Sequence, residues 1–182
     1  LNGGRVHHLG DVGDGIRTYQ ELVRQHVSTP AHEQTAPDTI ASIVSCDDAI
    51  ADGSTLNISL SITTREAVDV ADVRVVLWGD DGLAALDSYT RTQGSSVRLH
   101  PDRNVLTLAV GPLRLKRGRY AISVAVLDRS NNRHLYWGDR VRTVDVDGPT
   151  AAAVSYTPPL MCASIGRRND QASQSGVSSS RC

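Results

Sequence analysis

Residues 118–137, GRYAISVAVLDRSNNRHLYW, carry the pattern that decides the fold. Apolar side chains recur at every second position, at Tyr120, Ile122, Val124 and Val126, as in a strand with one buried face. The run DRSNN at 128–132 is rich in turn-forming residues, and a second apolar stretch follows it. The sequence therefore predicts a β-hairpin whose apolar face must be covered by other strands.

The rest of the central region repeats this alternation without any helical period. Further strands are predicted at residues 39–46, 55–63, 73–78, 83–89, 105–110 and 140–146. One sheet could not bury so many apolar faces, so two sheets must pack together. The predicted fold class is mostly β, an immunoglobulin-like antiparallel β-sandwich.

The flanking regions differ from the sandwich in pattern and composition. In residues 1–29 we expect a short β-hairpin followed by a helix, with Asp11 or Asp14 as its N-cap. Residues 30–37 are interpreted as a linker, 38–148 as the sandwich, and 149–182 as a low-complexity, disordered tail. Because residues 1–4 contain neither an initiator Met nor a leader, we expect the chain to be the C-terminal part of a longer protein.

Composition argues against several classes of function. The 182 residues are 40% hydrophobic and 21% charged, with a net charge of −1, whereas nucleic-acid binders normally carry a basic excess. No apolar run approaches the roughly 20 residues that cross a bilayer. The three cysteines, Cys46, Cys162 and Cys182, favour a reducing compartment over a disulfide framework, and Cys46 is expected to be a small core residue.

Motifs for catalysis and metal binding are absent. A P-loop needs GxxxxGK followed by Ser or Thr, and Lys116, the single lysine, lies in the sequence Leu-Lys-Arg. There is no GxSxG or HExxH motif. The pairs Asp47-Asp48 and Asp80-Asp81 are interpreted as turn residues, and the six histidines as structural or surface residues. We expect no catalytic residue and no metal site.

A polar face with one tryptophan is the candidate binding surface. Alternation places Trp78 and Arg74 on the side of their strand opposite to Val75 and Leu77. If the neighbouring strands lie in the same sheet, this face suits a sugar, which stacks on an aromatic ring while its hydroxyls form hydrogen bonds. The alternative is an ordinary solvated outer face. The candidate glycan-binding residues are Asn57, Ser59, Ser61, Arg74, Trp78 and Ser123.

Two further features could contribute to binding. As neighbours on a strand, Tyr136 and Trp137 should face opposite ways, one in the core and one exposed. The basic residues around one turn are interpreted as a solvated loop, with docking to an acidic glycan or partner as the alternative. They are Arg114, Lys116, Arg117 and Arg119.

Two stretches of the chain resemble one family. Residues 1–27 resemble the end of an ABC-transporter nucleotide-binding domain, with matches at Gly4-Arg5-Val6, Gly10 and Tyr19. The second stretch resembles the C-terminal domain of Wzt-type ATP-binding subunits, which serve ABC exporters of O-antigen and related cell-surface polysaccharides. The matching residues are TIASI at 39–43, GSTL at 53–56, DDG at 80–82, Leu113 and, above all, 118–128.

The resemblance implies a glycan-recognition module of a bacterial ABC exporter. It would bind a lipid-linked, O-antigen-type polysaccharide in the cytoplasm for export, as a step in lipopolysaccharide biosynthesis. The implied partners are a transmembrane subunit at the inner membrane and a second copy in a homodimer. ATP and Mg would belong to the parent transport ATPase, because this chain lacks the Walker A, signature and Walker B segments and is not expected to be an enzyme.

Two other functions remain open at this stage. The sandwich could be purely structural, dimerising or supporting the ATPase without binding glycan, in which case another subunit should cover the face that bears Trp78. A glycan-cleaving enzyme would require two carboxylates facing each other across a cleft. The sequence shows no such pair.

Overall fold

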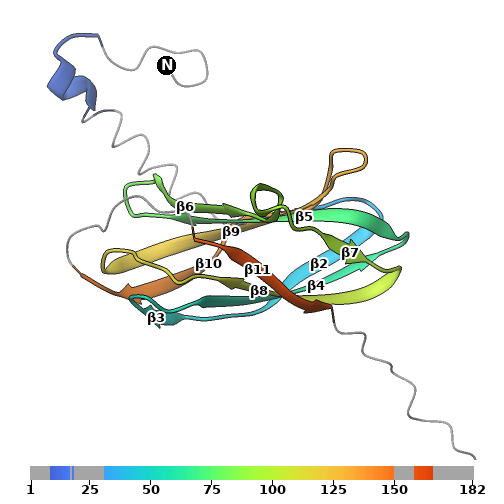
Figure 1. The fold of residues 1–182 in the computed structure, drawn as a ribbon. Helices are drawn as coiled ribbons and strands as arrows, with labels where there is room; N and C mark the ends of the chain where they lie inside the picture. The colour runs from blue at the N-terminus through green and yellow to red at the C-terminus, as the bar shows by residue number, and fades with distance from the viewer. Residues whose placement is uncertain (1–8, 17, 19–30, 150–157, 166–182) are drawn as a thin grey trace, which may run out of the picture.

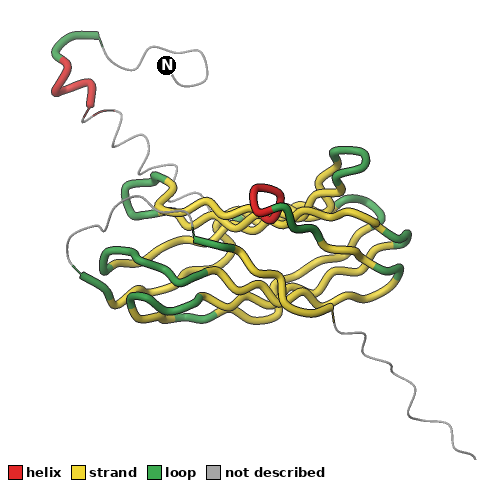
Figure 2. The backbone as a smooth tube through the Cα atoms, viewed as in Figure 1, coloured by secondary structure: helices red, strands yellow, loops and turns green. Residues whose placement is uncertain are grey.

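The structure is a computed structural model, and it describes residues 9–16, 18, 31–149 and 158–165. Two sheets pack face to face (Figures 1 and 2). The first has seven strands, in the order β1-β10-β9-β5-β6 with β3 beside β10 and β7 beside β5; the second has the order β11-β8-β4-β2. This arrangement confirms the predicted mostly-β sandwich. The helical segments that the structure describes lack the length and apolar character of a membrane-spanning helix.

The strands have the following bounds. In the seven-stranded sheet they are β1 His32–Thr35, β3 Ala49–Ala51, β5 Val68–Trp78, β6 Ala84–Tyr89, β7 Val97–Leu99, β9 Gly118–Asp128 and β10 Arg133–Asp147. In the four-stranded sheet they are β2 Thr39–Cys46, β4 Leu56–Thr64, β8 Asp102–Val110 and β11 Leu160–Ile165. A short 3-10 helix, η1, spans Thr90–Gln93.

The predicted hairpin is formed by β9 and β10, which pair antiparallel from Asp128 and Arg133 onward. Its turn is held by side chains, because the carboxylate of Asp128 accepts from the Ser130 amide (2.9 Å) and the Asn131 side chain accepts from the Arg133 amide (3.1 Å). β10 is longer than predicted. It joins two predicted strands across a register shift between Gly138 and Arg142, which is the mark of a bulge.

The core lies between the two sheets, where the alternating apolar faces meet. The predicted inward residues of β4 and β9, from Leu56 to Ile62 and from Tyr120 to Val126, are no more than 2% exposed. They pack in one cluster with the alternating residues of β5 and β8, as predicted. The core positions of those two strands are Val73, Val75, Leu77, Leu106, Leu108 and Val110.

Two strands lie where the sequence predicted a linker and a tail. β1, from the predicted linker, pairs antiparallel with the first part of β10. Its sequence, HEQT, has no apolar alternation, and all four residues are exposed. β11, from the predicted tail, pairs with the edge of β8 and buries Leu160. Pro158-Pro159 does not exclude a strand here, because a proline is tolerated just before a strand begins.

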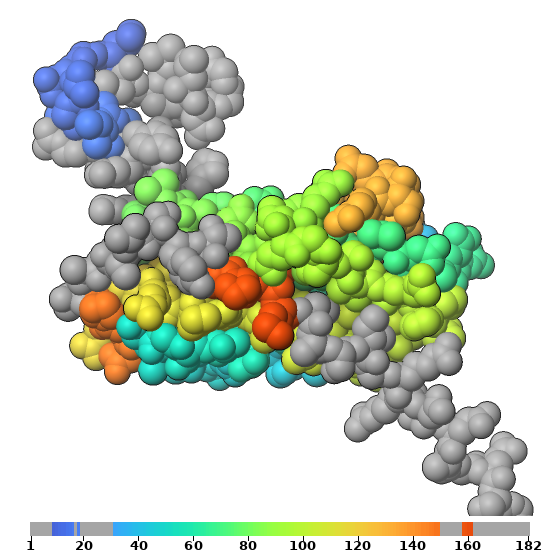
Figure 3. All heavy atoms as spheres, in the orientation of Figure 1, coloured from blue at the N-terminus to red at the C-terminus, as the bar shows by residue number. Residues whose placement is uncertain are grey.

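β11 is also tied to the other sheet. The Ser88 hydroxyl donates to the Pro158 carbonyl (2.8 Å), and the Leu160 amide donates to the Gln93 side chain (3.0 Å). In the space-filling view, the orange-red atoms of β11 lie against the yellow-green segment around η1 (Figure 3). The sandwich therefore extends past its predicted boundary at residue 148.

The chain crosses from one sheet to the other between β2 and β3. β2 pairs with β4 in the four-stranded sheet, and after Asp47-Asp48 the chain continues as β3 beside the end of β10. The β3–β10 pairing is parallel, which makes it an exception to the predicted antiparallel arrangement. It is extended at its ends by hydrogen bonds from Asp145 N to Asp48 O and from Asp52 N to Asp147 O, both 2.9 Å.

The predicted N-terminal helix is described only in its first turn. Residues 12–16 and 18 are helical, and the Asp11 carboxylate accepts from the amides of Gly13 (2.7 Å) and Asp14 (3.3 Å), so Asp11 acts as the N-cap. Most of the predicted N-terminal hairpin and the rest of the helix lie outside the described residues.

Removing β11 should destabilise the sandwich. A chain that ends at residue 149 loses the burial of Leu160 and the hydrogen bonds of Pro158 and Leu160, so we expect it to be less stable by at least about 3 kcal/mol. The matched control ends at residue 165 and keeps β11. Urea unfolding of the two chains measures the difference, and equal midpoints and slopes would contradict a structural role for β11.

Candidate functional site

The six predicted glycan-binding residues lie on two opposite surfaces. Arg74, Trp78 and Ser123 belong to β5 and β9, on the outer face of the seven-stranded sheet. Asn57, Ser59 and Ser61 belong to β4, on the outer face of the four-stranded sheet. The prediction that they form one face is therefore wrong. Alternation determines which side of its own strand a residue takes, but it does not determine which sheet the strand joins.

The Ser123 hydroxyl joins three strands on the outer face of the seven-stranded sheet. It accepts hydrogen bonds from the Trp78 indole N–H (2.8 Å) and the Arg140 amide (2.9 Å), and it donates to the Asp139 carboxylate (2.7 Å). A serine hydroxyl has one donor and two acceptor positions, so all three are used. Ser123 is 2% exposed, and it organises this face rather than offering a hydroxyl to a ligand.

Arg140 crosses the sheet to reach Trp78. It has a φ of 50° next to the β10 bulge, and its guanidinium carbon lies 4.8 Å from the centre of the Trp78 ring. This distance is within the range of a cation–π interaction. The pair forms a bridge from β10, over Ser123 on β9, to β5, and we call it the Arg140–Trp78 bridge. One face of the Trp78 ring is therefore occupied by the protein itself.

Arg74 is also engaged within the protein. Its guanidinium donates two hydrogen bonds to the Asp87 carboxylate on β6, at 2.8 and 2.5 Å. The hydrogen bonds to Asp87 raise the pKa of Arg74. Of the three predicted residues on this face, Ser123 is saturated, Arg74 is ion-paired and Trp78 is partly covered. The sequence could place them on one face but could not show these partners.

A hollow beside Trp137 lies on the same sheet and was not predicted as a site. Tyr136 is buried and Trp137 is partly exposed, which confirms that the two neighbours face opposite ways. The Tyr136 hydroxyl donates to Glu33 (3.2 Å), and burial raises the pKa of Tyr136. The hollow has a volume of about 370 Å³, and we call it the Trp137 hollow. It is lined by Gln34, Thr35, Ala36, His134 and Trp137.

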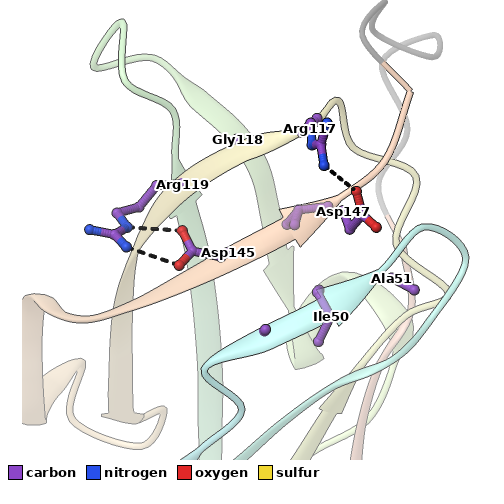
Figure 4. Close-up of a pocket in the computed structure, with 9 residues that line it drawn as sticks. Ile50, Ala51, Arg117, Gly118, Arg119, Asp145 and Asp147 are labelled. Carbon is purple, nitrogen blue, oxygen red and sulfur yellow. Dashed lines mark hydrogen bonds and ion pairs between the residues drawn. The ribbon is translucent and has the colours of Figure 1, made fainter.

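A second hollow lies at the far ends of β9 and β10 and beside β3 (Figure 4). Its volume is about 550 Å³, and two ion pairs line it. Arg119 donates two bonds of 2.9 Å to Asp145, and Arg117 lies 3.2 Å from Asp147. The hydrogen bonds from Arg119 lower the pKa of Asp145. Much of the predicted basic cluster is thus ion-paired, since Lys116 also lies 4.0 Å from Asp80.

One buried carboxylate on this sheet has a structural role. Asp72 is 1% exposed and accepts two hydrogen bonds from Arg129, one of them 2.9 Å from Nε. Arg91 lies 3.7 Å away, and the Tyr89 hydroxyl donates at 3.4 Å. Burial, followed by the charge of Asp72, raises the pKa of Tyr89. A buried carboxylate needs such partners to offset its desolvation.

Of the two acidic pairs, Asp80-Asp81 makes a local turn bond, whereas Asp47 bonds across to the neighbouring strand β4. The Asp47 carboxylate accepts from the amide of Asn57 (2.8 Å), and the Asp81 carboxylate accepts from the amide of Leu83 (3.0 Å). Within the described residues, no group of three or more His, Cys, Asp or Glu is placed to hold a metal ion. Cys46 is half-buried against the core, and burial raises its pKa to about 11.

Comparison with known proteins yields similarity in structure but not in sequence. No protein-family model and no curated protein matches the chain. The crystal structure of the C-terminal domain of Wzt is similar, with a TM-score of 0.55 and 11% identity over 70% of this chain and 90% of that chain. At this identity, the similarity shows that the two share a fold.

Two further solved structures are less similar. One is the CARDB domain of a Pyrococcus furiosus protein in complex with di-metal ions, with a TM-score of 0.39 and 18% identity over 63% of this chain and 99% of that chain. The other is β-glucosidase from Listeria innocua in complex with glucose, with a TM-score of 0.34 and 13% identity over 62% of this chain and 16% of that chain. Both TM-scores are below 0.5, so neither structure bears on function.

Replacing Ser123 should weaken the outer face of the seven-stranded sheet. In Ser123→Ala, the Trp78 indole and the Arg140 amide lose their acceptor, and we expect a loss of about 1–3 kcal/mol of unfolding free energy. The matched control is Ser59→Ala on the other sheet, which should stay within about 0.5 kcal/mol of the native chain. Urea unfolding compares them, and an equally small effect of both substitutions would contradict the role of Ser123.

Replacing Arg119 should raise the pKa of Asp145. In Arg119→Gln, the ionised carboxylate loses its charged donor, so its pKa should move up toward the ordinary range of an aspartate. NMR titration of the Asp145 side-chain carbon measures this shift. The control is Arg98→Gln, which removes an exposed pair with Asp69 and should leave Asp145 unchanged. An unchanged pKa in Arg119→Gln would show that the ion pair does not persist in solution.

Proposed function

We propose that the sandwich is the glycan-recognition module of an ABC exporter's ATP-binding subunit. It would bind a lipid-linked, O-antigen-type polysaccharide in the cytoplasm and present it for export. The observation that carries this proposal is the similarity in fold to the C-terminal domain of Wzt. The two chains share a backbone fold although only 11% of their aligned residues are identical. This similarity in fold therefore supports the family resemblance separately from the sequence motifs.

The outer face of the seven-stranded sheet has the chemistry that the proposal requires. Both tryptophans of the chain lie on it, since Trp78 pairs with Ala121 of β9 and Trp137 pairs with Ala125. Aromatic rings accept the C–H face of a sugar, and nearby amides, hydroxyls and guanidinium groups accept or donate hydrogen bonds to its hydroxyls.

The proposed function also implies the protein and the partners with which the module would act. The module would act within a longer transport ATPase, whose own nucleotide-binding domain would hold ATP and Mg. A transmembrane subunit of the exporter and a second copy of the chain would be its partners, at the inner face of the membrane. The chain itself would bind glycan without cleaving it.

Titration with glycan tests the proposal. We expect cell-surface polysaccharide, released from the source organism by mild acid, to produce saturable NMR shifts in the full chain. These shifts should be concentrated on β1, β5, β9 and β10 rather than on β2, β4, β8 and β11, because the aromatic face belongs to the first set. Absence of any shift at millimolar glycan would overturn the proposal.

Light scattering separates this function from the structural alternative. If the sandwich only dimerises through the Trp78 face, then Trp78→Ala should halve the measured mass and the glycan should cause no shifts. If the sandwich binds glycan, the NMR shifts should appear whether the chain is a monomer or a dimer.

A further inference from the structure

We propose that the Trp137 hollow is a subsite for one neutral pyranose ring of the polysaccharide. The sugar ring stacks on the Trp137 indole, and its hydroxyls bond to the side-chain amide of Gln34, which lies directly opposite Trp137. This inference rests on the proposed function and assigns it to one place on the outer face. The hollow takes the place of the six glycan-binding residues predicted from the sequence, because the fold puts those residues on two different sheets.

The hollow is built by two paired strands. Gln34 of β1 lies directly opposite Trp137 of β10, and Thr35 lies opposite Tyr136. Ala36 follows β1 and is buried, and its amide donates to the Leu135 carbonyl (3.1 Å), so the end of β1 is fixed against β10. The volume of about 370 Å³ is near the lower end of the range of about 300–1,000 Å³ for small-molecule sites.

The lining of the hollow selects against charged ligands. Its five lining residues include no Asp, Glu, Lys or Arg, and those on the Trp137 side of the strands are an amide, an imidazole and an indole. A phosphate or an ammonium group would lose its water shell here without meeting an opposite charge. A neutral sugar offers hydroxyls to the Gln34 amide, whose nitrogen lies 2.7 Å from the His32 ring nitrogen and which keeps its oxygen and a second N–H for a ligand. The second hollow, with its two ion pairs, has the opposite character.

Trp137 is better placed than Trp78 to receive a sugar ring. Arg140 lies over the Trp78 ring, and the Trp78 N–H is bonded to Ser123. Trp137 has His134 as a perpendicular neighbour, with ring centres 5.8 Å apart. One perpendicular ring can cover at most one of the two indole faces. Its contact also holds the indole in place, which lowers the entropy that a ligand must overcome.

The presence of only two tryptophans gives a direct experiment. Trp78→Phe leaves Trp137 as the single indole, and Trp137→Phe leaves Trp78. Each chain is titrated with polysaccharide released by mild acid from the source organism, and with neutral gluco-, galacto-, manno- and rhamno-oligosaccharides. We expect Trp78→Phe to show a saturable change in emission with the affinity found by NMR. Trp137→Phe should show none, and Trp137→Ala should bind about tenfold or more weakly.

Variants in β1 test the polar contacts independently. Gln34→Ala should lower affinity by about three- to tenfold, because it removes a hydrogen bond to the sugar. Thr35→Ala should change affinity little, because the side chains of neighbouring strand residues take opposite sides. Thr63→Ala, on the outer face of the four-stranded sheet, is the matched control and should leave affinity unchanged. If the Trp137 variants do not fold, as judged by their amide spectra, these β1 variants decide the question.

The outcomes separate the subsite from the general function. If glycan shifts the NMR spectrum of the full chain but neither Trp137 emission nor the β1 variants respond, the subsite is wrong and the proposed function survives. If no glycan binds at all, the proposed function is wrong and the subsite is wrong with it. Polygalacturonate serves as the acidic probe, and a stronger Trp137 response to it than to every neutral glycan would overturn the assignment to neutral sugars.

Discussion

Strand β9 is hydrogen-bonded along both edges, buried on its inner face and buried at the centre of its outer face, and the outer surface of the larger sheet depends on this constraint. Its inner residues fill the core, whereas its outer residues at 121, 123 and 125 are Ala, Ser and Ala. Small side chains at the centre allow long ones from β5 and β10 to reach across. Without them, Arg140 could not lie over Trp78, and the Ser123 hydroxyl could not join three strands.

The two hollows differ in the charge of the β10 residues that line them. The Trp137 hollow is lined by His134 and Trp137, whereas the second hollow is lined by Asp145 and Asp147, each facing an arginine. The exposed ion pairs add little to stability, because water already solvates both partners well. Their effect is on recognition: they present balanced charge in the second hollow, whereas the Trp137 hollow presents an aromatic ring and polar groups without Asp, Glu, Lys or Arg.

Much of the fold could be predicted from the sequence, because long strands with one apolar face leave a period of two. Residues 56–62 and 120–126 illustrate this, and β2 was predicted with its observed bounds. β1, β3 and β7 are only three or four residues long, and HEQT carries no apolar signal. The candidate site was harder to predict. Whether Asn57 and Trp78 share a surface depends on which sheet each strand joins. The Trp137 hollow depends on β1, which pairs with the distant strand β10 and leaves no local pattern in the sequence.

The position of β1 has a thermodynamic consequence. This strand is held at the sheet edge by its pairing with β10, yet it supplies Gln34 and Thr35 to the hollow. A ligand that contacts both strands therefore stabilises the pairing of β1 with β10. By linkage, this stabilisation equals the free energy by which the pairing strengthens binding of the ligand. β1 leads directly into β2, the first strand of the smaller sheet. Binding in the hollow is therefore linked to the attachment of β1 to the edge of the larger sheet, at the point where the chain enters the sandwich.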